Sequence, residues 1–83
     1  MAMCMLSPEQ SRAARGWLGW SQEDLSKRAN VGLSTLKDFE SGKRSPMRNN
    51  LEAMRRVLES AGIGLLFDNE GKPHGITAAL HKP

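Results

Sequence analysis

The sequence predicts a mainly α-helical domain that ends in a short β segment. Two pairs of apolar residues within residues 22–41 stand at helical spacing, so each pair lies on one face of a short helix. The pairs are Leu25 with Ala29 and Leu36 with Phe39. Only a tight bend fits between them, and two short helices joined by such a bend form a helix-turn-helix. After residue 62 the helical spacing gives way to short apolar runs and turn-forming residues, which indicate strands.

A capping pattern marks the start of the first helix. Ser7 is followed by Pro8 and Gln10, which is typical of a capping box with proline in the first turn, and the helix runs to about Trp17. The residues expected to face inward are Ala13, Ala14, Trp17 and Leu18. Trp17 and Trp20 are expected in the core rather than stacked on bases, because a small core needs large apolar groups.

The two helices of the motif follow. Ser21 is an N-cap, and the acidic residues of the next turn suit the positive end of the helix dipole. This helix ends near Ala29. The next runs from about Leu33 to Ser41, where Gly42 stops it.

A fourth helix is expected to start between Met47 and Asn50, with Ser45 and Asn49 as competing caps. Its apolar residues are spaced three, four and three apart, which is typical of an amphipathic helix. These residues are Leu51, Met54, Leu58 and Ala61.

The tail at residues 62–83 predicts a β-hairpin. Residues 63–67 form an apolar run, residues 68–73 are dense in turn formers, and residues 75–80 form a second strand that its alanines weaken. A lone hairpin is marginal in water, so it either packs on its own helices or pairs with another chain. Antiparallel pairing of an exposed edge with its twin would give a two-fold homodimer.

Length and composition limit the class of protein. Eighty-three residues suit one domain with a small core, divided into a helical part at residues 6–61 and the β tail. A membrane span would need about 18 or more consecutive apolar residues, and the sequence has no such run. The first ten residues do not resemble a secretory signal. Cys4 stands alone and His74 and His81 lack a metal-binding spacing, so no disulfide, metal or other cofactor is expected, and a reducing cytoplasm fits.

Positive charge is concentrated in the middle of the chain. The net charge is +3 overall, yet residues 27–56 carry a net +5 while the segments before and after each carry a net −1. The excess surrounds the second helix of the motif and the loop after it, where a phosphate backbone would run. A basic face that is merely solvated is the alternative.

These features resemble the lambda-repressor/Cro-type (XRE-like) helix-turn-helix of phage and bacterial regulators. The matching residues are Gln22, Leu25, Ala29, Val31, Leu36, Phe39, Glu40 and Gly42. Asn30 stands where the family usually has glycine, but asparagine is the non-glycine residue best able to adopt the positive φ needed there. The resemblance extends loosely over about residues 7–61. It implies a lambda-repressor-like four-helix DNA-binding domain, a phosphate contact by Gln22, and a structural ion pair between Arg15 and Glu40 that fixes the angle of the recognition helix.

The outward face of the second motif helix is the candidate base-reading surface. It consists of Leu33, Ser34, Lys37 and Asp38, with Thr35 at its margin. Lys37 can donate to guanine, Asp38 can accept from cytosine, and Leu33 can touch a thymine methyl. Ser34 can donate or accept. The alternatives are that Leu33 belongs to the core, that Lys37 reaches a phosphate, and that Asp38 is solvated or paired with a basic neighbour.

Candidate phosphate contacts lie at helix starts and in the basic loop. Ser21 and Gln22 stand at a helix N-terminus, where backbone N–H groups and the helix dipole favour an anion. Lys43, Arg44 and Arg48 follow the recognition helix and supply positive charge. The alternative for Gln22 is a neutral residue that only starts its helix.

The sequence gives little support for an enzyme, because it contains no nucleophile–base arrangement, no glycine-rich phosphate loop and no plausible carboxylate pair. Two function classes remain. The first is a sequence-specific regulator of transcription, most simply a repressor, which binds double-stranded DNA as a homodimer with half-sites about one helical turn apart. The second is a protein-interaction module, of which the antitoxin of a toxin–antitoxin pair is the sharpest version. The short tail favours the first class, since an antitoxin generally needs a toxin-binding extension.

Overall fold

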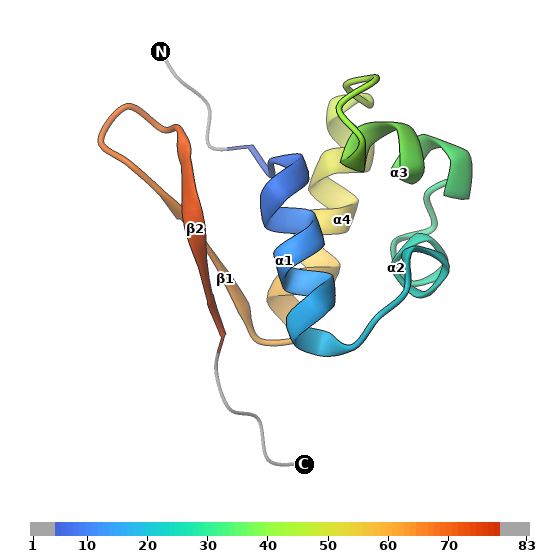
Figure 1. The fold of residues 1–83 in the computed structure, drawn as a ribbon, viewed down its shortest axis with the longest axis horizontal. Helices are drawn as coiled ribbons and strands as arrows, with labels where there is room; N and C mark the ends of the chain where they lie inside the picture. Colours follow the sequence, from blue (N-terminus) through green and yellow to red (C-terminus); the bar gives the residue numbers. More distant parts are fainter. Residues whose placement is uncertain (1–4, 79–83) are drawn as a thin grey trace.

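The computed structural model describes residues 5–78 and contains four helices followed by a two-stranded hairpin (Figure 1). The elements are α1 (Pro8–Leu18), α2 (Gln22–Ala29), α3 (Leu33–Glu40), α4 (Arg48–Ser60), β1 (Ile63–Phe67) and β2 (Pro73–Ala78). The predicted fold class, mainly helical with a C-terminal β-hairpin, is confirmed. The predictions for Cys4, for His81 and for the end of the second strand concern positions outside the described residues.

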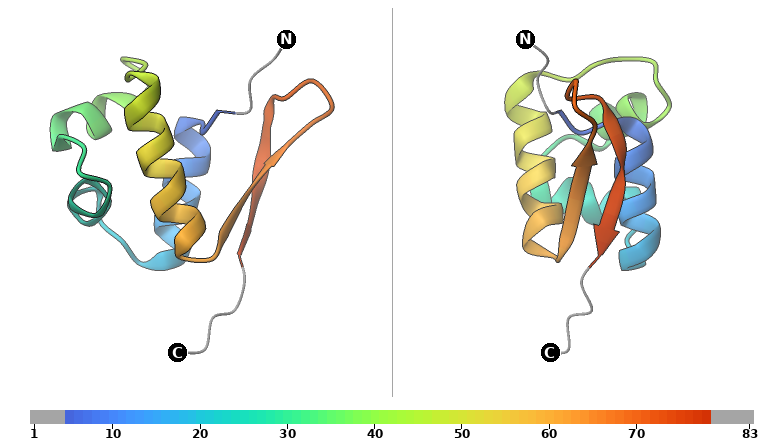
Figure 2. Two further views of the ribbon diagram at one scale, coloured as in Figure 1. Left: turned by 180° about the vertical axis from the view of Figure 1, so that it is seen from behind. Right: turned by 90° about the vertical axis from the view of Figure 1, so that its left-hand side faces the viewer.

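The helices α1 and α4 stand between the hairpin and the helix-turn-helix. Figure 1 and the reverse view in Figure 2 show the hairpin on one side of these two helices and α2 and α3 on the other. β2 packs against α1, and β1 packs against α4. The chain therefore presents α3 on the side of the molecule that faces away from its C-terminal hairpin.

The core is built from the apolar faces that the sequence predicted. Leu25 of α2, Leu36 of α3, and Met54 and Leu58 of α4 are completely buried. Ala29, Phe39 and Leu51 are also buried, and Ala61 is half-buried at the end of α4. Burial of these side chains removes apolar surface from water, which is the main force that holds such a small helical unit together.

The prediction for the inner face of α1 is partly wrong. Trp17 is 58% exposed and Ala13 is exposed, whereas Gln10, Ser11 and Ala14 face inward. The buried polar side chains have hydrogen-bond partners on other elements, so their burial costs little. Ser11 and Ala14 are completely buried, and the Ser11 hydroxyl donates to the Glu40 carboxylate at the end of α3. Trp20 is half-buried and packs against the core.

Local signals determine most helix boundaries. Both capping boxes are formed: Ser7 with Gln10, and Ser21 with Asp24. Asn30 ends α2 with a φ of 55°, the left-handed conformation expected at this turn. α3 ends at Glu40, one residue before the predicted end.

Neither of the two predicted cap residues stands at the start of α4. The helix begins at Arg48, and the capping position is held by Met47, whose side chain makes no capping hydrogen bond. Neither Ser45 nor Asn49 caps it, because Asn49 already lies inside the first turn and Ser45 lies two residues too early.

The hairpin packs on its own protomer and is held there by one glutamine. Ile63 pairs with Ala78 and Leu65 pairs with Ile76, and these four side chains pack against the helices. The ladder is irregular between Leu66 and Phe67. At this irregularity the buried Gln10 amide of α1 donates to the carbonyl oxygens of Leu66 and Gly75, each at 2.9 Å, which ties both strands to α1.

Candidate DNA-binding surface

The outward face of α3 is open to solvent. Ser34 and Lys37 are exposed, and Leu33, Thr35 and Asp38 are half-buried. The opposite face of the same helix is buried through Leu36 and Phe39. The described part of the C-terminal tail lies on the far side of α1 and α4 and does not cover α3 (Figure 1). A polar helix face of this kind, standing clear of the rest of the chain, has the shape that enters a major groove.

The basic loop is attached to the end of α3 through the backbone of Asp38. Its carbonyl oxygen accepts from the amide of Lys43 at 2.9 Å, from the amide of Arg44 at 3.3 Å and from the Ser41 hydroxyl at 3.1 Å. These bonds hold the two cationic residues beside the end of α3 instead of leaving them on a free loop. Lys43 and Arg44 are exposed, as is Arg48 at the start of α4.

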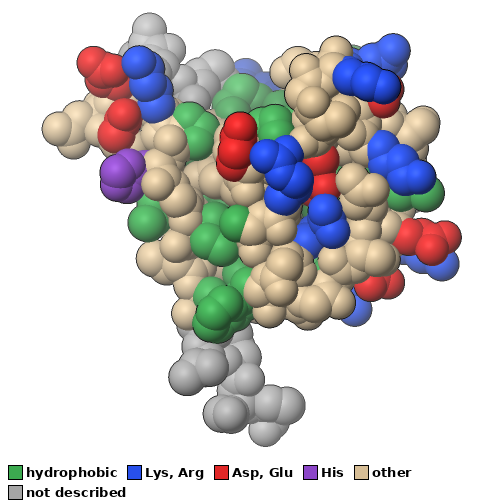
Figure 3. Space-filling model, in the orientation of Figure 1, with side chains coloured by type: hydrophobic (Ala, Val, Ile, Leu, Met, Phe, Trp, Pro, Cys, Tyr) green, Lys and Arg blue, Asp and Glu red, His purple; other side chains and the backbone are tan. Residues whose placement is uncertain are grey.

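Positive side chains gather over the helices. In Figure 3 most of the lysine and arginine side chains on the visible face lie over the helical side of the molecule, while hydrophobic side chains gather toward the hairpin. On this face the positive charge therefore lies mainly over the helices, with acidic side chains among it (Figure 3).

The start of α2 combines features that attract and repel an anion. Ser21 is exposed, and its hydroxyl accepts from the Asp24 amide at 2.9 Å. Hydrogen bonds from the Ser21 backbone and hydroxyl lower the pKa of Asp24, so this carboxylate is charged at neutral pH. Glu23 stands in the same turn. The two carboxylates reduce the attraction that the helix dipole would otherwise exert on a phosphate.

Gln22 is engaged in a way that the sequence did not indicate. Its side-chain amide donates to the Glu40 carboxylate at 3.0 Å, so it links α2 to the end of α3. A primary amide carries a second N–H, which the bond to Glu40 does not use. Gln22 is half-buried.

Glu40 is the centre of a buried polar cluster. The residue is 2% exposed, and its carboxylate receives the Arg15 guanidinium at 2.9 and 2.6 Å, the Ser11 hydroxyl at 2.5 Å and the Gln22 amide. The Arg15–Glu40 ion pair therefore exists and is bidentate. Arg12 adds a hydrogen bond from α1 to the Glu40 backbone carbonyl at the end of α3.

The charge state of Glu40 follows from these contacts. Burial by itself would raise the pKa of Glu40, but the hydrogen bonds from Arg15, Ser11 and Gln22 and the charge of Arg15 outweigh it and hold the pKa below its ordinary value. The carboxylate is thus ionised at neutral pH and joins α1, α2 and α3.

The sequence pattern missed Ser11 and Gln10 as polar residues of the interior. One local signal for Ser11 existed, since it stands four residues before Arg15 and so shares its helix face. Within residues 5–78 no group of three or more His, Cys, Asp or Glu could hold a metal ion. No helix of that part of the chain is long and apolar enough to cross a membrane.

The fold and this surface define a helix-turn-helix protein. A family model described as helix-turn-helix matches residues 12–61, more than half of the chain, and the chain belongs to this family. The match includes all four helices except the first turn of α1.

A curated relative adds a more particular comparison. The chain is 42% identical over 57 residues to Multiprotein-bridging factor 1 of Schizosaccharomyces pombe. The aligned part is 69% of this chain and 36% of the relative, so the chain spans about a third of the length of that protein.

Proposed function

We propose that the protein is a sequence-specific regulator of transcription that inserts α3 into the major groove of double-stranded DNA. The observation that carries the proposal is the solvent-exposed pair Ser34 and Lys37 on α3, with Lys43 and Arg44 held beside them by the Asp38 carbonyl. Membership of the helix-turn-helix family supports the same conclusion, because the second helix of this motif commonly reads base edges.

In this proposal several side chains on the outward face of α3 contact base edges. Lys37 donates to guanine O6 or N7, and Ser34 donates or accepts one turn earlier. Leu33 and Asp38 are half-buried, so each presents only part of its side chain to a groove. Leu33 contacts a thymine methyl and Asp38 accepts from a cytosine amino group.

Phosphate contacts come from both sides of α3. Lys43, Arg44 and Arg48 provide charge on one strand, and the salt dependence of binding follows mainly from them. On the other side Ser21 and Gln22 donate hydrogen bonds. Gln22 donates its second amide N–H, which the bond to Glu40 does not use, and the bond to Glu40 orients the Gln22 side chain.

We further propose that two protomers bind one duplex as a homodimer joined through the edges of their hairpins. The hairpin and α3 lie on opposite sides of α1 and α4 (Figures 1 and 2). Stacking two hairpins face to face would carry the two α3 helices to opposite ends of the assembly. Edge-to-edge pairing keeps the helices of both protomers on one side of a continuous sheet, where both α3 helices can meet the same duplex.

The regulator acts without enzymatic chemistry or a cofactor. It binds chromosomal DNA in the cytoplasm of a prokaryotic cell, most simply as a repressor.

A second candidate function is a protein-interaction module, with the antitoxin of a toxin–antitoxin pair as one form. The observation that favours this candidate is the name of the yeast relative, Multiprotein-bridging factor 1, which implies protein partners for that protein.

Selection of bound duplexes from a random pool tests the proposal. We expect a two-fold symmetric consensus with half-site centres about 10–10.5 base pairs apart or a multiple of that spacing. A pool that shows no enrichment would contradict a base-reading role. Recovery of a stoichiometric small protein partner from native extract, together with a failed selection, would favour the protein-interaction module.

A further inference from the structure

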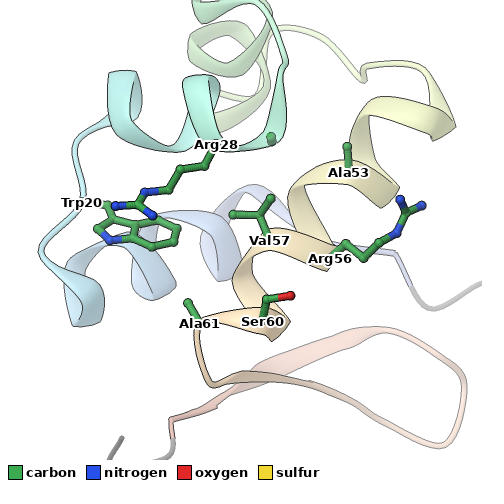
Figure 4. Close-up of a pocket in the computed structure, with 8 residues that line it drawn as sticks. Trp20, Arg28, Ala53, Arg56, Val57, Ser60 and Ala61 are labelled. Atoms are coloured by element: carbon green, nitrogen blue, oxygen red, sulfur yellow. The ribbon is translucent and has the colours of Figure 1, made fainter. Parts of the chain in front are cut away.

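We propose that a groove between α2 and α4 docks an acidic peptide segment that carries an apolar anchor side chain. The groove has a volume of about 610 Å³ and opens to solvent between the last turn of α2 and the second half of α4 (Figure 4). This surface is separate from the proposed DNA contact, since none of the candidate DNA residues lines it.

The floor of the groove is apolar and made of small side chains. Ala53, Val57 and Ala61 are spaced four residues apart on α4, so they form one row along the helix. All three are half-buried, and Ala29 completes the floor from α2. The alanines leave the hollow that a larger partner side chain, such as leucine, would fill.

Two arginines and a tryptophan form the walls. Arg28 reaches in from α2, and Arg56 stands at the other end of the groove on α4 (Figure 4). The Arg28 guanidinium lies over the Trp20 ring, 4.3 Å from its centroid, which holds the charge in place. Both arginines are exposed.

Neither arginine forms a salt bridge with a described residue, although the charge of Arg28 acts on Asp24 from one turn away. Salt bridges among residues 5–78 use Arg15, Arg55 and Lys72, and neither Arg28 nor Arg56 takes part in one. Asp24 stands one turn before Arg28 on α2, and Glu52 stands one turn before Arg56 on α4, where it borders a neighbouring hollow. The groove itself is therefore cationic and lined by no carboxylate.

This combination of features fits a peptide better than a nucleic acid. A phosphate backbone could pair with the arginines, but it offers no apolar group for the floor. A segment with a leucine flanked by carboxylates satisfies both, because each guanidinium can hold a carboxylate through charge-assisted hydrogen bonds. Arginine and tryptophan are also the side chains that most often carry the binding energy of protein interfaces.

The test uses the full-length chain and a short fluorescein-labelled peptide in which leucines at helical spacing are flanked by aspartates. Binding is followed by fluorescence anisotropy. The variants are Arg28→Gln and Arg56→Gln, and the matched control is Lys72→Gln, which removes the same charge from the exposed hairpin turn. Because each variant removes the guanidinium that would hold a peptide carboxylate, it should weaken peptide binding by about tenfold.

A second readout reports on the groove directly. Trp17→Phe leaves Trp20 as the only tryptophan of the chain, so peptide binding should change its emission. Arg56→Gln serves as the independent variant, because Arg56 lies at the other end of the groove from Trp20 (Figure 4), which Arg28 covers.

Saturable binding of the leucine–aspartate peptide, weakened by both groove variants and not by Lys72→Gln, supports the proposal. If a peptide with serines in place of the leucines binds equally well, binding depends on charge alone and the proposal is overturned. Absence of saturable binding, or equal loss in the control variant, would also overturn it. If the groove variants weaken binding to DNA while peptide binding is unchanged, the groove is a phosphate contact and the proposal fails, although the DNA-binding function stands.

Discussion

Removing Arg15 should expose how strongly the Glu40 cluster holds the motif together. We consider Arg15→Met, which keeps the apolar part of the side chain and deletes its charge. The change removes two of the four side-chain hydrogen bonds to the Glu40 carboxylate, at 2.9 and 2.6 Å, and a third bond from Arg15 to the Trp20 carbonyl. The Glu40 carboxylate, which is 2% exposed in the wild-type chain, loses the guanidinium that forms its salt bridge.

The expected cost in the free energy of unfolding is large for a small protein. Breaking a buried ion pair by removing one partner costs about 3–5 kcal/mol. Ser11 and Gln22 still donate to Glu40, and the Arg15 side chain is 17% exposed, so we expect the lower end of that range, about 3 kcal/mol. The double variant Arg15→Met, Glu40→Met should recover part of this loss, because it removes the unpaired charge as well.

The assay is urea unfolding followed by circular dichroism, at neutral pH and near pH 4. In the wild-type chain the lowered pKa of Glu40 stabilises the fold above the ordinary value of 4.5, and this contribution is lost as pH falls through the folded-state pKa. In Arg15→Met burial is opposed only by Ser11 and Gln22, so the pKa rises. The difference in stability between variant and wild type should therefore be largest at neutral pH and smaller near pH 4.

The comparison variant is Arg55→Met, which breaks the pair of Arg55 with Glu59 on α4 and also removes the guanidinium from over the Phe67 ring, a contact that adds about 0.5–1 kcal/mol. An exposed pair of this kind contributes about 0.3–0.5 kcal/mol. The reasoning is refuted if Arg15→Met costs no more than this control, or if the double variant with Glu40→Met is less stable than Arg15→Met alone.

Three further predictions test other parts of the account. Lys43→Ala with Arg44→Ala should lower affinity for all duplexes and reduce the slope of log affinity against log salt by about 2, measured by anisotropy; an unchanged slope removes the loop from the phosphates. Gln10→Leu should cost about 1–3 kcal/mol and speed hydrogen exchange at residues 63–67, because two hairpin carbonyls lose their donor and the Ser7 amide loses its acceptor; exchange at residues 63–67 that stays at the wild-type rate would show that Gln10 does not hold the hairpin. Thr77→Lys should shift sedimentation toward monomer, since lysine on an edge strand opposes pairing with a twin, and an undiminished dimer would place the interface elsewhere.

The elements that sequence reasoning predicted correctly depend on local signals. Ser7 and Ser21 each mark a helix start through contacts to residues three positions away. The apolar faces of α2, α3 and α4 follow from spacing within each helix. Asn30 has the positive φ that its place in the turn requires.

What was missed depends on contacts between distant parts of the chain. Gln22 is bound to Glu40, 18 residues later, and Gln10 reaches carbonyl groups 56 and 65 residues later. The residue type of Trp17 predicts a core position, but the buried positions of α1 are held by Gln10, Ser11 and Ala14. The spacing of residues within one helix does not predict which side chains of another element will contact that helix.

The most direct test of the central claim is to repeat the random-pool selection with Lys37→Ala. If α3 reads base edges, the variant should lose preference at one or two positions in each half-site while the rest of the consensus persists, with a cost of about 1–3 kcal/mol on the wild-type site. An unchanged consensus bound more weakly at every position would contradict the claim, because it would mean that Lys37 contacts only the phosphate backbone.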